Sequence, residues 1–115
     1  MLKDIRVLVV DDNALNLTII RGILEKDYVL DFAKTGKEAL EIAKKNTPDI
    51  ILLDIMMPDM DGYEVLGYIK KIPTLSKSKI IMISALVNLD SRLRGYQLGA
   101  HDFIGKPFDD DELKA

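Results

Sequence analysis

Three uninterrupted apolar runs constrain the fold of this chain more than any other feature of its sequence. They cover residues 7–10, 50–53 and 80–83. Strands that are apolar at every position need cover on both faces, which is typical of a parallel sheet flanked by helices. Two less regular runs also have the length of strands. The five predicted strands are residues 5–10, 28–32, 50–53, 80–83 and 103–104.

Between these runs, apolar residues recur with the period of a helix. Four stripes predict four amphipathic helices: Leu17, Ile20 and Leu24; Ala39, Leu40 and Ala43; Val65, Leu66 and Ile69; and Leu89, Leu93 and Tyr96. Thr35 with Glu38, and Asp61 with Glu64, have the spacing of a capping box, and Gly99 is placed to end the fourth helix. Strict alternation of strands and helices predicts an α/β fold with an open, doubly wound sheet.

Length and charge limit the classes of function. A chain of 115 residues that is 48% hydrophobic can form one globular domain, and a net charge of -3 argues against a nucleic-acid partner. The absence of cysteine excludes disulfides and thiolate metal sites. No apolar run approaches the roughly 20 residues of a transmembrane helix, and residues 1–4 lack a signal-peptide pattern. We therefore expect a cytoplasmic domain with no membrane partner.

The end of the chain has the pattern of a helix start. Asp109 and Glu112 have capping-box spacing, and the sequence stops at Ala115. We therefore expect residues 1–115 to form one domain that is truncated at the start of its last helix, with the fifth helix largely missing. An apolar strip of the sheet would then be exposed or covered by self-association.

Polar residues follow four of the five predicted strands. In an open α/β sheet, ligands bind at the carboxyl ends of the strands. The residues at those ends are Asp11, Asp12, Asp54, Ser84, Ala85, Lys106 and Pro107. Asp11 and Asp12 could instead simply cap the helix that follows them, as could Asn13.

Three carboxylates in one cleft repel each other, and a bound cation relieves the repulsion. Ligation by oxygen alone suits Mg²⁺. A carboxylate left free of the metal could attack a phosphoryl group to form an aspartyl phosphate. Ser84 could then donate to a phosphoryl oxygen, and Lys106 could offset its charge.

These residues, in this order, resemble the motifs of the receiver domains of two-component response regulators. The matching segments are Asp11-Asp12, residues 53–62 (LDIMMPDMDG), Ser84-Ala85 and Lys106-Pro107-Phe108. Each segment alone is weak, but together they are specific, and the resemblance covers the whole chain except its end. It implies a doubly wound, five-stranded parallel sheet of the flavodoxin-like receiver type with strand order 2-1-3-4-5.

The resemblance also assigns roles around the phosphoryl group. Asp54 would accept it from a histidine kinase or a histidine phosphotransfer protein. Asp11, Asp12, Asp54 and the backbone carbonyl of Met56 would hold Mg²⁺, or Mn²⁺ in its place. The domain would be a signalling switch that takes part in its own phosphorylation and dephosphorylation, and not an enzyme.

Further residues would bind or respond to the phosphoryl group. Ser84, Ala85 and Lys106 would contact it, and Phe103 would change rotamer as Ser84 moves. The bond between Lys106 and Pro107 would be a cis peptide that points Lys106 into the site.

Two further positions would tune the lifetime of the phosphorylated form. In such domains they lie two residues beyond the acceptor and two beyond the switch hydroxyl, which here are Met56 and Leu86. Neither side chain can activate a water molecule, so we predict slow hydrolysis.

An attached output domain or an effector protein would read the switch, and a homodimer could form through the fourth helix and the fifth strand.

Three other functions share this fold. A flavodoxin-type cofactor module is disfavoured by Asp11 and Asp12, which would repel an FMN phosphate. A Mg²⁺-dependent phosphatase usually needs a second aspartate where Met56 stands. A scaffold that is never phosphorylated would not need an intact acidic site.

Overall fold

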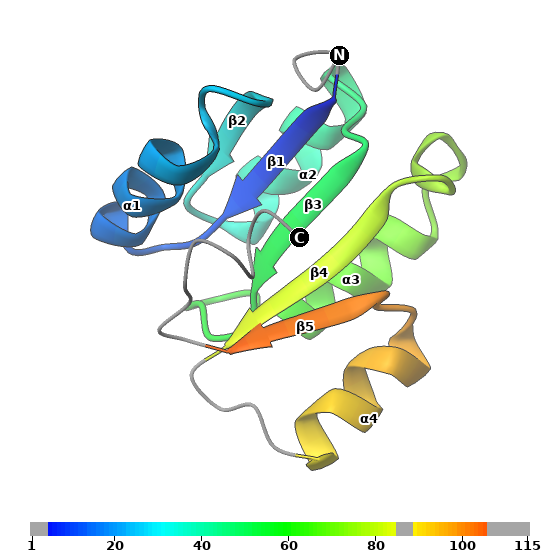
Figure 1. Cartoon of the computed structure of the whole chain (residues 1–115). Coiled ribbons are helices and arrows are strands. Elements are labelled where there is room, and N and C mark those ends of the chain that lie inside the picture. Colours follow the sequence, from blue (N-terminus) through cyan, green and yellow to red (C-terminus); the bar gives the residue numbers. More distant parts are fainter. Residues whose placement is uncertain (1–4, 85–88, 106–115) are drawn as a thin grey trace.

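The computed structural model describes residues 5–84 and 89–105 and contains a five-stranded parallel sheet in the order β2-β1-β3-β4-β5 (Figure 1). The strands are β1 (Arg6–Val10), β2 (Val29–Ala33), β3 (Ile50–Asp54), β4 (Lys79–Ser84) and β5 (Asp102–Gly105). The helices are α1 (Ala14–Leu24), α2 (Gly36–Lys45), α3 (Gly62–Lys70), α4 (Leu89–Leu98) and the short 3₁₀ helix η2 (Pro73–Leu75).

The predicted fold class and strand order are confirmed, and every strand bound lies within one residue of the predicted one. The helix η2 was not predicted. The fifth helix would fall on residues 106–115, which lie outside the described residues, so its absence stays a prediction. Among the described residues, no helix has the length and apolar character needed to cross a membrane.

Burial on both faces of the sheet explains the uninterrupted apolar strands. Leu8 and Val10 of β1 pack in the core that α2 and α3 cover, whereas Val7 and Val9 pack in the core that α1 covers. Successive side chains of a strand point to opposite faces, so each face requires its own set of apolar residues.

The helix ends follow the capping signals with one difference. Asp61 and Glu64 form a complete capping box at the start of α3. At the start of α2, Thr35 Oγ1 accepts a hydrogen bond from the Glu38 backbone N–H at 3.1 Å. The Glu38 side chain, however, accepts from the backbone N–H of Lys34 at 3.3 Å, so only half of the predicted box is present.

Gly99 ends α4 as predicted, with a φ of 107°. Its backbone N–H donates to the carbonyl of Tyr96 at 3.0 Å, and the N–H of Ala100 donates to the carbonyl of Gly95 at 2.9 Å. This pair of bonds is a Schellman motif, in which a positive φ favours glycine.

His101 joins the start of β5 to β4. Its backbone N–H donates to the carbonyl of Ile80 at 2.8 Å, and its Nδ1 accepts from the backbone N–H of Ile80 at 3.0 Å. The ring nitrogen thus satisfies a strand donor that would otherwise need another partner.

Gly62 lets the start of α3 approach the end of β3. Its backbone N–H donates to the carbonyl of Ile55 at 2.9 Å. A Cβ atom on Gly62 would collide with the backbone carbonyl oxygen of Asp54 and lie 2.8 Å from the Cα of Ile55. The absence of a side chain at Gly62 therefore sets how closely α3 packs behind Asp54.

We predict opposite effects from two glycine-to-alanine changes in α3. Gly62→Ala forces backbone apart and should lower the free energy of unfolding by about 1–3 kcal/mol. Gly67→Ala meets no atom within 4 Å. This control should raise the free energy of unfolding by about 0.5–1 kcal/mol, because alanine favours a helix interior. Urea unfolding of both variants measures the difference, and a stable Gly62→Ala variant would contradict the prediction.

Candidate functional site

The register of the central strands brings the acidic residues together. Val10 of β1 pairs with Leu53 of β3, so the residues that follow them, Asp11 and Asp54, lie side by side at the carboxyl edge of the sheet. The arrowheads of β1 and β3 in Figure 1 end at this edge. Carboxylate oxygens of Asp11, Asp12 and Asp54 lie within 4.8 Å of one another. The structure thus assembles the predicted acidic cluster.

The three carboxylates differ in exposure. Asp11 and Asp54 are each 2% exposed, whereas Asp12 faces solvent. Crowded carboxylates with little access to water repel strongly unless a cation or donors compensate them. The donor set consists of oxygen atoms, which fits Mg²⁺, and the exposed Asp12 leaves the cluster open to solvent.

Asn13, and not either aspartate, caps α1. Its side-chain oxygen accepts from the backbone N–H groups of Leu15 at 2.8 Å and Asn16 at 3.4 Å. Asp11 and Asp12 are therefore not needed to cap the helix, which removes the simplest structural explanation for their presence.

The Asp11 carboxylate is held by its own sequence neighbours. Its Oδ1 accepts from the backbone N–H of Asn13 at 2.9 Å, and its Oδ2 accepts from the Asn16 side-chain amide at 3.2 Å. Sequence reasoning missed Asn16, although its position five residues after Asp11, on the first turn of a capped helix, is a signal that could have found it.

Met56 lies two residues beyond Asp54, in the loop between β3 and α3, and its side chain is 59% exposed. It brings no polar side-chain group to the site. Asp59 in the same loop has a φ of 68°, a conformation that aspartate and asparagine tolerate better than most residues.

β4 and β5 lead to the same edge of the sheet. Asp54 pairs with Ile83, the residue before Ser84, and Ser84 pairs with Gly105, the residue before Lys106. Of Ser84 the structure describes the backbone. The remaining predicted site residues, Ala85, Leu86, Lys106 and Pro107, lie outside the described residues, as does the predicted cis peptide.

Phe103 is buried, with 8% of its surface exposed, in the core covered by α2 and α3. Its ring packs edge-on against Tyr96 with centroids 5.2 Å apart. A Cβ atom on Gly95 would collide with the Phe103 ring, so the lack of a side chain at Gly95 makes room for the inward position.

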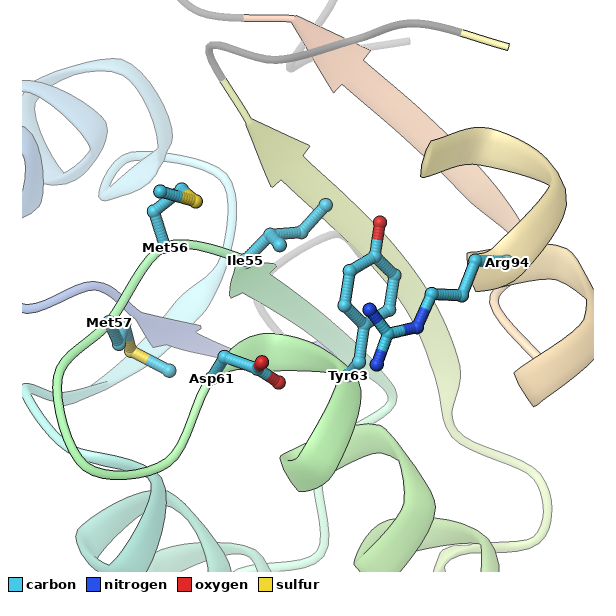
Figure 2. A pocket seen from close by; sticks show the side chains of 6 residues that line it. All are labelled: Ile55, Met56, Met57, Asp61, Tyr63 and Arg94. Atoms are coloured by element: carbon cyan, nitrogen blue, oxygen red, sulfur yellow. The ribbon is translucent and has the colours of Figure 1, made fainter. Parts of the chain in front are cut away.

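A pocket of about 490 Å³ opens beside the site, between the loop after β3, the start of α3 and α4 (Figure 2). Its lining residues are Ile55, Met56, Met57, Asp61, Tyr63 and Arg94. Figure 2 shows the Arg94 guanidinium over the face of the Tyr63 ring, 4.2 Å from its centroid. This cation–π contact ties α4 to α3. No spacing in the sequence predicts it, because it depends on how two helices pack.

Comparison with known proteins identifies the family of this arrangement. A family model described as the response regulator receiver domain matches residues 7–115. The response regulator PleD of Caulobacter vibrioides is 42% identical over 111 residues, which cover 96% of this chain and 24% of PleD. The probable transcriptional regulator ycf27 of Guillardia theta is 43% identical over 115 residues, covering 96% of this chain and 42% of ycf27. The chain therefore spans less than half the length of either relative.

A solved structure agrees along almost its full length. The chemotaxis protein CheY4 of Vibrio cholerae superposes with a TM-score of 0.92 at 28% sequence identity, covering 96% of this chain and 92% of that chain. The family match, the relatives and the shared architecture lead to one conclusion: this chain belongs to the receiver domain family of response regulators.

Proposed function

We propose that Asp54 accepts a phosphoryl group in a Mg²⁺-dependent reaction and that the phosphorylated domain regulates a partner. The observation that carries this proposal is the position of a buried Asp54 carboxylate among Asp11 and Asp12 at the carboxyl edge of the sheet. The donor would be a histidine kinase or a histidine phosphotransfer protein, as the family implies.

Asp54 suits the role of nucleophile better than its neighbours do. Asp11 accepts donors from the start of α1 on both oxygens, which suits a fixed ligand. Asp12 is exposed, and Asp54 lies in the middle of the edge, with β1 on one side and β4 on the other. One oxygen of Asp54 would attack phosphorus, forming an O–P bond. The P–N bond to the donor histidine would break, and its electron pair would return to the imidazole.

The surrounding groups would lower the cost of adding negative charge. Asp11, Asp12, Asp54 and the backbone carbonyl of Met56 would hold Mg²⁺, with Mn²⁺ as a substitute, and the bound cation would offset the charge on the phosphoryl oxygens. The hydroxyl of Ser84, with the backbone of Ala85, would donate to these oxygens. Lys106, held by a cis bond to Pro107, would supply a fixed positive charge.

Phosphorylation would shift an equilibrium between two conformations. Ser84 would move toward the phosphoryl group and Phe103 would change rotamer, which would alter the surface of α4 and β5. An attached output domain, an effector or a second copy of this chain would read that surface. We place this phosphoryl transfer in the cytoplasm, where a histidine kinase has access to ATP. We assign residues 1–115 to one receiver domain.

Phosphorylation of Asp54 can be tested by intact mass. We expect acetyl phosphate or carbamoyl phosphate with Mg²⁺ to add one phosphoryl group to the wild type and none to Asp54→Asn. The matched control is Asp59→Asn, which removes an exposed carboxylate from the neighbouring loop; it should be labelled like the wild type. Labelling of Asp54→Asn, or none of the wild type, would overturn the assignment. Catalytic turnover of small phosphate esters would favour a phosphatase instead.

The lifetime of the phosphorylated form tests the roles of Met56 and Leu86. The combined change Met56→Asn and Leu86→Gln would place carboxamides where they can orient an attacking water. We expect the phosphorylated form to decay faster by at least about tenfold. The decay is followed by mass after the phosphodonor is removed. Asp59→Asn, which also adds a carboxamide to this loop, should decay like the wild type, and an unchanged lifetime in the double variant would contradict the prediction.

The switching role of Phe103 can be separated from phosphorylation. We expect Phe103→Leu to be labelled like the wild type but to show smaller changes in the amide chemical shifts of α4 on phosphorylation. The control is Phe32→Leu on β2, where the ring lies under the Arg21 guanidinium and far along the sheet from β5. If Phe103→Leu and the wild type respond alike, Phe103 has no part in the switch.

A further inference from the structure

We propose that Asn16 is a positioning residue that fixes the Asp11 carboxylate for cation binding, and this inference rests on the Mg²⁺ site of the proposed function. Asn16 lies in the first turn of α1. Its side-chain amide donates to Asp11 Oδ2 at 3.2 Å, while the backbone N–H of Asn13 donates to Asp11 Oδ1 at 2.9 Å. The two donors approach different oxygens, so together they restrain rotation of the carboxylate.

The same three residues join the helix cap to the acidic cluster. Asn13 Oδ1 accepts from the backbone N–H of Asn16 at 3.4 Å, and the side chain of Asn16 continues to Asp11. Hydrogen bonds therefore link the Asp11 carboxylate to the first turn of α1 through both Asn13 and Asn16. Formation of the helix places the amide that orients the carboxylate.

The Asn16 amide and the Asn13 backbone N–H are electrically neutral donors. They restrain the carboxylate without adding a positive charge of their own. A carboxylate oxygen can accept more than one hydrogen bond or ligand, so contact with Asn16 does not block the oxygen.

Restraint is valuable because Mg²⁺ demands a near-ideal arrangement of its ligands. A carboxylate that is free to rotate must be immobilised when the ion binds, at a cost in conformational entropy. Groups that hydrogen-bond to metal ligands commonly change metal affinity by about 10–100-fold. The single neutral bond from Asn16 belongs at the lower end of this range.

The test is direct calorimetric titration of the protein with MgCl₂. Asn16→Leu removes the amide, preserves much of the volume and keeps a residue that favours helix. We expect it to raise the Mg²⁺ dissociation constant by about 10-fold. The matched control is Thr18→Leu, an exposed polar residue on the same helix whose hydroxyl donates to the carbonyl of Ala14 and not to the site. It should bind Mg²⁺ like the wild type.

A second measurement separates positioning from damage to the fold or the chemistry. Labelling by acetyl phosphate in Asn16→Leu should be slow at limiting Mg²⁺ and return close to the wild-type rate at saturating Mg²⁺, because Asp54 is untouched. Circular dichroism checks that the variant is folded, and Asn16→Ala replaces it if it is not. Unchanged Mg²⁺ affinity, or labelling that stays slow at saturating Mg²⁺, would overturn the role of Asn16.

The outcomes distinguish this inference from the proposed function. Wild-type protein that binds Mg²⁺ but is never labelled would refute phosphorylation of Asp54 while leaving the Asn16 effect measurable. Normal labelling of the wild type with equal Mg²⁺ affinity in Asn16→Leu would refute only the inference. Wild-type protein that does not bind Mg²⁺ would refute both.

Discussion

Pairing of β1 with its two neighbours is the constraint on which the rest of this structure depends. β1 lies between β2 and β3, and its residues 7–10 are apolar on both faces. A shift of one residue would move each side chain to the opposite face, where it would no longer fit the close-packed core, so packing on both sides fixes the register. That register sets Asp11 beside Asp54. The chemistry at the edge of the sheet is therefore a consequence of packing in its interior.

Much of this organisation could be predicted from the sequence, because it follows from local patterns. The apolar runs and the helical stripes are periodic signals, and the carboxyl-edge rule converts their order into a location for Asp11, Asp12 and Asp54. The strand register then sets which of these residues lie side by side. Strand ends differ from the prediction by at most one residue, because the last residues of a strand carry weaker apolar signals.

Other features depend on contacts that no local pattern encodes. His101 bonds to Ile80 through a ring nitrogen, and Arg94 lies over Tyr63 only because α3 and α4 pack together. Half of the predicted capping box at Thr35 is replaced because the Glu38 carboxylate reaches the N–H of Lys34 instead. Each of these side chains has several possible partners nearby, and the tertiary structure determines which partner it contacts.

A hydrogen bond joins the two ends of the loop between β3 and α3, because the backbone N–H of Gly62 donates to the carbonyl of Ile55. Within the loop, Met56 and Asp59 are exposed, whereas Met57 is buried in the core. Substitutions at the two exposed positions therefore need not transmit strain to Asp54. Sequence changes at these exposed loop positions can therefore alter the surface beside the acidic cluster while the Asp54 carboxylate stays in place.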